Sequence, residues 1–162
     1  SLPHGVPSDK KVESGEFVLM DFGATYDGWH SDMTRTVCVG KPSDKMKFVY
    51  ETVLTAQLAA LDAVKAGMSG KALDKIARDI ITEAGYGDNF GHSLGHGVGV
   101  EIHESPYSSP SREDILPENS IVTVEPGIYL EGKFGVRIED FVVVTENGCI
   151  NMTKASKELI CL

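Results

Sequence analysis

Two aspartates with the spacing of a cation site lie on the strands of a predicted β-hairpin over residues 16–39. An Asp-Gly turn at positions 27 and 28 is a strong hairpin signal, and a two-residue loop there places Gly23 opposite Asp32. Because strand side chains alternate between faces, Asp21 and Asp32 become diagonal neighbours, about 5 to 8 Å apart at Cβ. Gly23 leaves space between them. Like charges this close are unfavourable without a cation between them, so the hairpin predicts either a cation site or a solvated polar face.

Three of the five histidines, His92, His96 and His103, lie in or beside a glycine-rich segment. The glycines disfavour a helix and favour a strand or loop that approaches another group closely. The His92 and His96 pair therefore differs from the helical His-Glu-x-x-His zinc motif. On an extended chain, residues four apart share a face but stand about 13 Å apart, too far to bind one ion. One of the two is expected to be a ligand and the other a substrate-binding or proton-transfer group.

Two further acids interrupt apolar segments that are predicted to be strands. Glu125 ends the segment 121–125, and Glu139 lies within 136–145. A buried carboxylate needs a cation or a hydrogen-bonding partner. Arg137 lies on the same strand face as Glu139 and is one candidate partner, and a cation is the other.

The elements that must position these residues are predicted in the order hairpin, two helices, then strands, which is an α+β fold. The helices are expected over residues 44–66, with Ser43 as N-cap and Gly67 as stop, and over 70–84. Residues 106–120 are expected to form a loop, and 121–125, 136–145, 149–152 and 158–162 to form strands, with a tight turn at Asn147-Gly148. The apolar stripes of the helices are Tyr50, Leu54, Leu58 and Leu61, and Leu73, Ile76, Ala77, Ile80, Ile81 and Ala84.

Composition and net charge limit the classes of binding partner that are expected. The 162 residues suffice for one domain, and 24 acidic against 15 basic side chains give a net charge of -9. That charge argues against nucleic acid or an anionic membrane as a partner. No apolar run approaches the roughly 18 residues that span a bilayer, and three cysteines without tight spacing fit a reducing compartment. We therefore expect a soluble, cytoplasmic protein.

Six segments together resemble the pita-bread metallopeptidases, and within that family the Xaa-Pro peptidases, aminopeptidase P and prolidase. The segments are Leu2-Pro3-His4-Gly5, Asp21-x10-Asp32-x-Thr34-Arg35-Thr36, the stretch 91–99, Ile102-His103-Glu104-Ser105-Pro106, Glu125-Pro126-Gly127-Ile128-Tyr129 and the stretch 135–140. The resemblance covers nearly the whole chain. It implies the pita-bread fold, of which residues 1–162 would be a single domain forming the C-terminal portion of the catalytic domain.

The resemblance also implies a two-metal site. Its ligands would be Asp21, Asp32, His96, Glu125 and Glu139, with Asp32 and Glu139 bridging two divalent ions. A set of one histidine and four carboxylates suits manganese best, with cobalt or zinc possible.

The implied reaction is hydrolysis of the N-terminal Xaa-Pro bond of di- or oligopeptides by a metal-bridging hydroxide, with Glu125 handling the proton. His92 and His103 would hydrogen-bond the substrate and the tetrahedral intermediate, and His4 would line the pocket. Tyr129 and Arg137 match positions that contact the ligands or the substrate.

Two alternatives remain open. A methionine aminopeptidase-like hydrolase has similar ligands, but commonly differs at Thr34-Arg35-Thr36 and lacks a histidine at the position of His92. An inactive pita-bread module that binds peptides typically loses ligands. By the resemblance, family members carry further elements before the His4 segment. The isolated fragment is therefore expected to bind metal with weak or no activity. The full-length protein is expected to be a homodimer.

Overall fold

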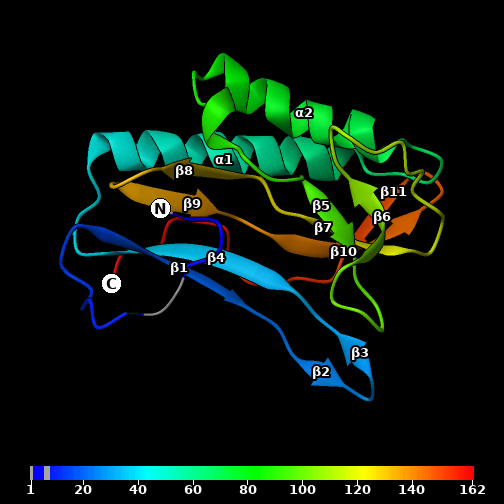
Figure 1. The fold of residues 1–162 in the computed structure, drawn as a ribbon, viewed down its shortest axis with the longest axis horizontal. Helices are drawn as coiled ribbons and strands as arrows, with labels where there is room; N and C mark the ends of the chain where they lie inside the picture. The colour runs from blue at the N-terminus through cyan, green and yellow to red at the C-terminus, as the bar shows by residue number, and fades with distance from the viewer. Residues whose placement is uncertain (1, 6–7) are drawn as a thin grey trace.

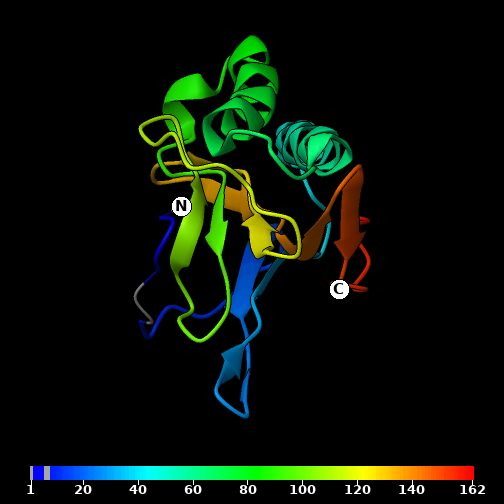
Figure 2. The same ribbon diagram turned by 90° about the vertical axis from the view of Figure 1, so that its right-hand side faces the viewer.

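Two helices cover one face of a layer of antiparallel strands, and a narrow β-ribbon extends from the opposite side (Figures 1 and 2). This computed structural model describes residues 2–5 and 8–162. The order confirms the predicted α+β class. The elements are β1 (Glu16–Phe22), β2 (Thr25–Tyr26), β3 (Trp29–His30), β4 (Met33–Val39), α1 (Asp44–Ala63), α2 (Gly70–Glu83), the 3-10 helix η1 (Gly87–Asn89), β5 (Gly95–Gly97), β6 (Glu104–Ser108), β7 (Ile121–Val124), β8 (Gly127–Leu130), β9 (Phe134–Arg137), β10 (Asp140–Thr145) and β11 (Gly148–Asn151).

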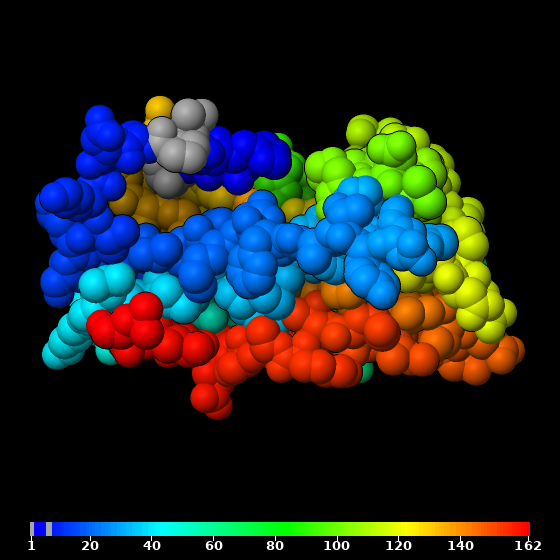
Figure 3. Space-filling model, turned by 90° about the horizontal axis from the view of Figure 1, so that it is seen from below, coloured from blue at the N-terminus to red at the C-terminus, as the bar shows by residue number. Residues whose placement is uncertain are grey.

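The β1–β4 ribbon has the predicted register. β1 pairs antiparallel with β4, and the same register continues into β2 and β3, where Tyr26 lies opposite Trp29. Asp27 and Gly28 have φ angles of 52° and 82°, the left-handed values that a two-residue hairpin turn requires. Seen from the side opposite the helices, the ribbon crosses the middle of the molecule between the N-terminal and C-terminal segments (Figure 3).

The remaining strands form a five-stranded sheet in the order β11-β10-β7-β5-β6, and β8 pairs with β9. The single strand predicted over 136–145 is wrong, because the chain breaks between β9 and β10. At this break the Glu139 N–H donates to the Thr34 carbonyl at 3.1 Å, which joins the sheet to the ribbon. The sequence prediction also missed β8 and began the loop too early, since β6 ends at Ser108.

The helices begin where predicted but differ in detail. Ser43 caps α1 by accepting a hydrogen bond from the Met46 N–H at 3.2 Å, and α1 ends at Ala63, before Gly67. The predicted apolar stripe of α1 is wrong at Leu58, which is 48% exposed. The buried face of α1 comprises Met46, Val49, Tyr50, Thr52, Val53, Ala56, Gln57 and Ala60.

The stripe of α2 is confirmed at its centre. Leu73, Ala77 and Ile81 are fully buried, whereas Ile76 and Ile80 are half-buried at the edges. The predicted turn at Asn147-Gly148 lies one residue earlier, since Thr145 pairs with Gly148. Residues 158–162 contribute an isolated bridge to β4, between Cys161 and Cys38. Neither helix of the described residues has the length and hydropathy needed to cross a membrane.

Candidate metal centre

Five side chains converge where the ribbon meets the sheet. Asp21, Asp32 and Glu139 each offer an oxygen within 4.8 Å of the others, and His96, Glu125 and Glu139 form a second such group. The first group comes from β1, from the residue before β4 and from the break between β9 and β10. The second comes from β5, from the end of β7 and from the same break. Since Glu139 belongs to both groups, the two candidate ion positions adjoin.

The hairpin positions the two aspartates through a close approach of its own chains. Asp21 lies opposite Thr34, and Asp32 precedes β4 by one residue. A Cβ on Gly23 would lie 1.9 Å from the Ser31 carbonyl oxygen. Gly23 therefore allows the two strands to cross closely beside Asp32. This differs from the expectation that it leaves a gap between the acids.

Glu139 is fixed from behind by the Thr-Arg pair of β4. The Thr34 hydroxyl donates to Glu139 Oε2 at 2.6 Å, and Arg35 Nη1 donates to the Glu139 main-chain oxygen at 2.6 Å. Arg35 also binds Asp140 through Nη2 at 2.7 Å. Glu139 is only 2% exposed, so its carboxylate has a defined position and little contact with solvent.

Thr123 performs a similar task for the second group, and sequence reasoning missed it. Its hydroxyl accepts from the His96 N–H and donates to Glu125 Oε1, both at 3.0 Å. A polar residue two positions before Glu125 in an otherwise apolar strand was the available signal, because it shares the face of Glu125. Thr34 could have been found in the same way, two positions after Asp32.

His96 presents its second ring nitrogen, Nε2, to the acids. Its Nδ1 lies 3.0 Å from the Gly97 carbonyl oxygen, which can only accept, so Nδ1 carries the proton of the neutral ring. Its Nε2 then faces Glu125 Oε1 at 3.2 Å and Asp32 Oδ2 at 3.7 Å. A carbonyl that fixes the tautomer in this way is typical of a histidine that binds a metal.

The electrostatics of the group fit a cation. Burial, with the charges of Asp21 and Glu125, raises the pKa of Asp32 to about 6 despite the opposing effect of His96. Burial and the charges of Glu125 and Asp32 raise the pKa of Glu139 well above its ordinary value. Burial alone would lower the pKa of His96, but its hydrogen bond to Glu125 raises it overall. Asp32 and Glu139 therefore bind protons more tightly than ordinary carboxyls do, and a bound cation would favour release of those protons.

Arg137 does not pair with Glu139 as one reading of the sequence expected. Its Nη2 binds Asp21, its Nη1 donates to the Tyr129 hydroxyl at 3.0 Å, and its Nε donates to the Thr34 hydroxyl at 3.1 Å. The strand break after Arg137 ends the regular alternation of side chains, which turns Glu139 toward Thr34 instead.

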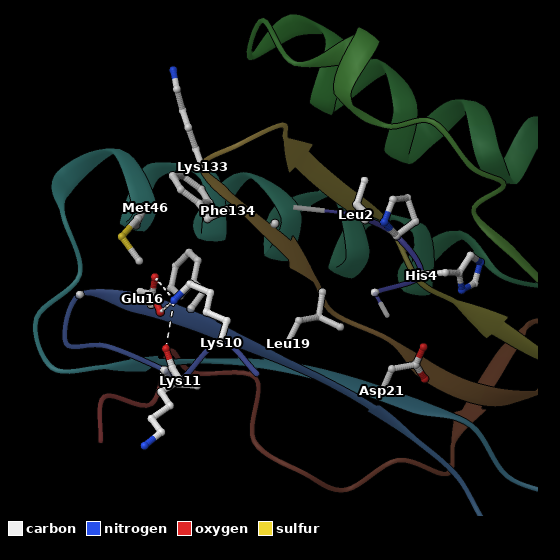
Figure 4. Close-up of a pocket in the computed structure, with 16 residues that line it drawn as sticks. Leu2, His4, Lys10, Lys11, Glu16, Leu19, Asp21, Met46, Lys133 and Phe134 are labelled. Atoms are coloured by element: carbon white, nitrogen blue, oxygen red, sulfur yellow. Dashed lines mark hydrogen bonds and ion pairs between the residues drawn. The ribbon is translucent and has the colours of Figure 1, made fainter. Parts of the chain in front are cut away.

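The histidines border a cavity of about 150 Å³ beside the acids, lined by Pro3, His4, His92, Ser93, Gly95, His96, His103, Tyr107, Glu125 and Arg137. The ring of His103 packs against that of His96, with centroids 4.3 Å apart. His4 also borders a wider hollow of about 740 Å³ along β1, and Figure 4 shows His4 and Asp21 at the same end of it.

His92 is already satisfied on both ring nitrogens. Nδ1 donates to the Ser93 carbonyl at 2.8 Å, and Nε2 accepts from the Tyr129 hydroxyl at 2.9 Å. Burial lowers the pKa of His92 and, together with the charge of His96, that of His103, so both rings are neutral at pH 7. A substrate contact by His92 Nε2 would therefore replace its hydrogen bond to Tyr129.

Comparison with known proteins shows the family to which the chain belongs. The profile of metallopeptidase family M24 matches residues 1–146. The chain is 54% identical over 160 residues to the Xaa-Pro dipeptidase of Pyrococcus furiosus, covering 99% of this chain and 46% of that protein. Among solved structures, the Xaa-Pro dipeptidase of Bacillus anthracis superposes with a TM-score of 0.97 at 54% identity, and the X-Pro aminopeptidase of Thermotoga maritima with 0.96 at 53%. Each match covers 99% of this chain and 45% of the solved one.

The chain thus spans about half the length of the relatives it matches. The matched residues 1–146 include both candidate ligand groups and the helices and strands that carry them. The chain belongs to metallopeptidase family M24 and has the pita-bread fold of its Xaa-Pro peptidases.

Proposed function

We propose that the protein containing this chain hydrolyses the bond between an N-terminal residue and a following proline, using two divalent ions. The observation that carries the proposal is the pair of adjoining ligand groups that share Glu139. The relatives named Xaa-Pro dipeptidase and X-Pro aminopeptidase support the choice of substrate.

The donor chemistry fits two hard or borderline ions. Asp21 would complete the ligands of one ion, His96 and Glu125 those of the other, and Asp32 and Glu139 would be shared. One nitrogen and otherwise carboxylate oxygens favour manganese, with cobalt and zinc as the other candidates. The bound ions would supply Lewis acidity and a water of lowered pKa.

The surrounding side chains have roles in moving and holding protons. Although burial alone would raise the pKa of Glu125, its hydrogen bond to His96 holds that pKa below the ordinary value. Glu125 therefore stays ionised at neutral pH and can accept the proton of the attacking water, then deliver it to the proline nitrogen as the bond breaks. His103 and His92 border the cavity and would hydrogen-bond the substrate and the tetrahedral intermediate, and His4 would line the pocket.

The substrate class is tested with the complete protein loaded with Mn²⁺, on Xaa-Pro, Xaa-Pro-Xaa and Met-Ala peptides of matched length. We expect hydrolysis of the prolyl peptides only, with chelator abolishing it and Mn²⁺ restoring it. Faster cleavage of Met-Ala would identify a methionine aminopeptidase-like enzyme instead. Binding of prolyl peptides without turnover at any metal loading would identify a peptide-binding module. The ratio of dipeptide to tripeptide rates separates a dipeptidase from an aminopeptidase.

We also propose that the complete protein is a cytoplasmic homodimer. The free cysteines, with Cys38 buried and Cys161 exposed, support a reducing compartment. The resemblance to the Xaa-Pro peptidases supports the dimer, and sedimentation of the complete protein measures it.

The raised pKa of Asp32 predicts that the metal-free protein loses stability as the pH rises. The folded chain binds this proton more tightly than the unfolded chain, so the contribution is complete below pH 3.8 and is lost as the pH rises through about 6. A rise in pKa from 3.8 to about 6 corresponds to about 3 kcal/mol. Unfolding of the complete protein in chelator between pH 4 and 7 measures it, with Asp32→Asn as the control that lacks this titration. Parallel pH profiles for the two proteins would contradict the prediction.

A further inference from the structure

An ion pair on α2 that the proposed mechanism does not use lies directly behind the His92 segment. Arg78 binds both carboxylate oxygens of Asp74, with Nε on Oδ2 at 2.7 Å and Nη2 on Oδ1 at 2.9 Å. Asp74 is 1% exposed, which is unusual for an acid unless it is paired. A two-point contact of this kind holds the planar guanidinium in one orientation.

The Asp74 and Arg78 side chains also form hydrogen bonds with the main chain of residues 90–94. Arg78 donates from Nη1 to the Phe90 carbonyl at 2.7 Å and from Nη2 to the His92 carbonyl at 2.8 Å. Asp74 Oδ1 accepts from the Leu94 N–H at 3.0 Å. Within the part of the chain that the structure describes, no hydrogen bond between main-chain groups involves residues 91–93. The Asp74 and Arg78 side chains therefore replace the sheet or helix bonds that this segment lacks.

A continuous set of contacts leads from the pair to the cavity. The Arg78 guanidinium lies over the Phe90 ring, 4.1 Å from its centroid, and Phe90 meets the His92 ring edge-on at 5.1 Å. His92 in turn holds the Tyr129 hydroxyl, which accepts from Arg137. A shift of residues 90–94 would therefore move both His92 and Tyr129.

Two of the proposed ligands, His96 and Glu139, are held by contacts outside this pair, whereas the Glu125 N–H donates to the Leu94 carbonyl at 2.8 Å. His96 is fixed by Thr123 and by the pairing of β5 with β6 and β7, and Glu139 is fixed by Thr34. Loosening residues 90–94 should consequently disturb His92 first, while the side chains of His96 and Glu139 keep their positions. A merely structural role would not separate the two effects.

We propose that Asp74 and Arg78 are positioning residues, which hold the main chain of residues 90–94 and thereby set the His92 ring against Tyr129 in the cavity. The kinetic part of this inference rests on the proposed Xaa-Pro hydrolysis. The positioning itself is a statement about His92 and can be measured without turnover.

Arg78→Lys is the informative variant, because lysine keeps the charge but lacks the planar fork. In the metal-loaded complete protein we expect kcat to fall about 10- to 100-fold, as for other partners that orient site residues. Metal affinity should stay within about threefold, and the ring 15N signals of His92 should shift. Lys75→Ala is the matched control, since Lys75 forms an exposed pair with Asp79 at the same spacing on the same helix. It should change neither readout.

A double-mutant cycle makes the test decisive. In a His92→Ala background, Arg78→Lys should lower kcat less than twofold further, because its effect passes through His92. An equal loss in both backgrounds, or a loss of metal affinity in proportion to kcat, would overturn the proposal. If Arg78→Lys does not fold, Asp74→Asn, which retains an acceptor for Leu94, takes its place. If the wild-type protein cleaves no prolyl peptide, the proposed function fails, and unchanged His92 signals in the variant would then refute the positioning separately.

Discussion

Asp32→Asn is expected to lower the rate of Xaa-Pro hydrolysis by the complete protein on the order of 10³-fold. Asp32 belongs to the group with Asp21 and Glu139, and its second neighbour is His96, so its carboxylate faces both candidate ion positions. Asparagine keeps the size but supplies a neutral oxygen, which weakens the attraction for both cations. Loss of several kcal/mol of transition-state stabilisation accounts for the expected factor, at about 1.4 kcal/mol for each tenfold.

The matched control is Asp27→Asn in the same hairpin. Asp27 is exposed at the turn with a φ of 52°, a conformation that asparagine also adopts readily. It should retain the wild-type rate. Steady-state rates at saturating Mn²⁺, with the bound metal counted by elemental analysis, give the comparison. An Asp32→Asn protein within tenfold of wild type would remove Asp32 from the site.

The part of the site that could be predicted from sequence is the part fixed by local geometry. A two-residue turn at positions 27 and 28 determines every cross-strand pair of the ribbon, and alternation then puts Asp21 and Asp32 on one face. The same local reasoning separated His92 from His96, and the structure gives these two histidines different partners.

The part that could not be predicted depends on contacts between distant segments. Nothing near Glu139 in the sequence reveals that the strand stops at Arg137 or that Thr34, more than a hundred residues earlier, binds its carboxylate. In an unbroken strand, alternation would put Arg137 and Glu139 on one face and make them partners. In the structure Arg137 instead binds Asp21 and donates to the Tyr129 hydroxyl.

The buried face of α1 was only partly predicted, for a related reason. The predicted stripe is right at Tyr50 and wrong at Leu58, because packing against α2 and the sheet buries a face that includes Val53, Ala56 and Ala60. Small side chains permit the close approach of helices, and the resulting packing stabilises the fold only when the neighbouring element is in place. Large apolar side chains in the sequence therefore do not by themselves identify the buried face of α1, because the neighbouring elements determine which residues are covered.

Glu139→Gln is expected to change stability and activity in opposite directions. Glu139 is 2% exposed and lies beside other carboxylates, which raises its pKa and makes its ionised form unfavourable in the metal-free fold. Glutamine has the shape of the protonated acid, can still accept from the Thr34 hydroxyl, and finds acceptors in the neighbouring carboxylates. In chelator at pH 8, the free energy of unfolding should therefore increase by about 1 to 3 kcal/mol.

The gain should shrink toward pH 5, because the raised pKa of Glu139 lets the wild-type carboxyl recover its proton as the pH falls. With Mn²⁺ the order reverses: the wild type gains stability from the ions, whereas the variant lacks a shared ligand and loses hydrolysis on the order of 10³-fold. Glu131→Gln, at an exposed turn between β8 and β9, is the control and should match the wild type in both conditions. A Glu139→Gln protein that is less stable than wild type in chelator at pH 8 would show that this acid is satisfied without a cation. A metal site of this kind requires the fold to keep a buried acid that lowers its stability until the ions bind. Denaturation of wild type and Glu139→Gln with and without Mn²⁺ measures that loss of stability directly.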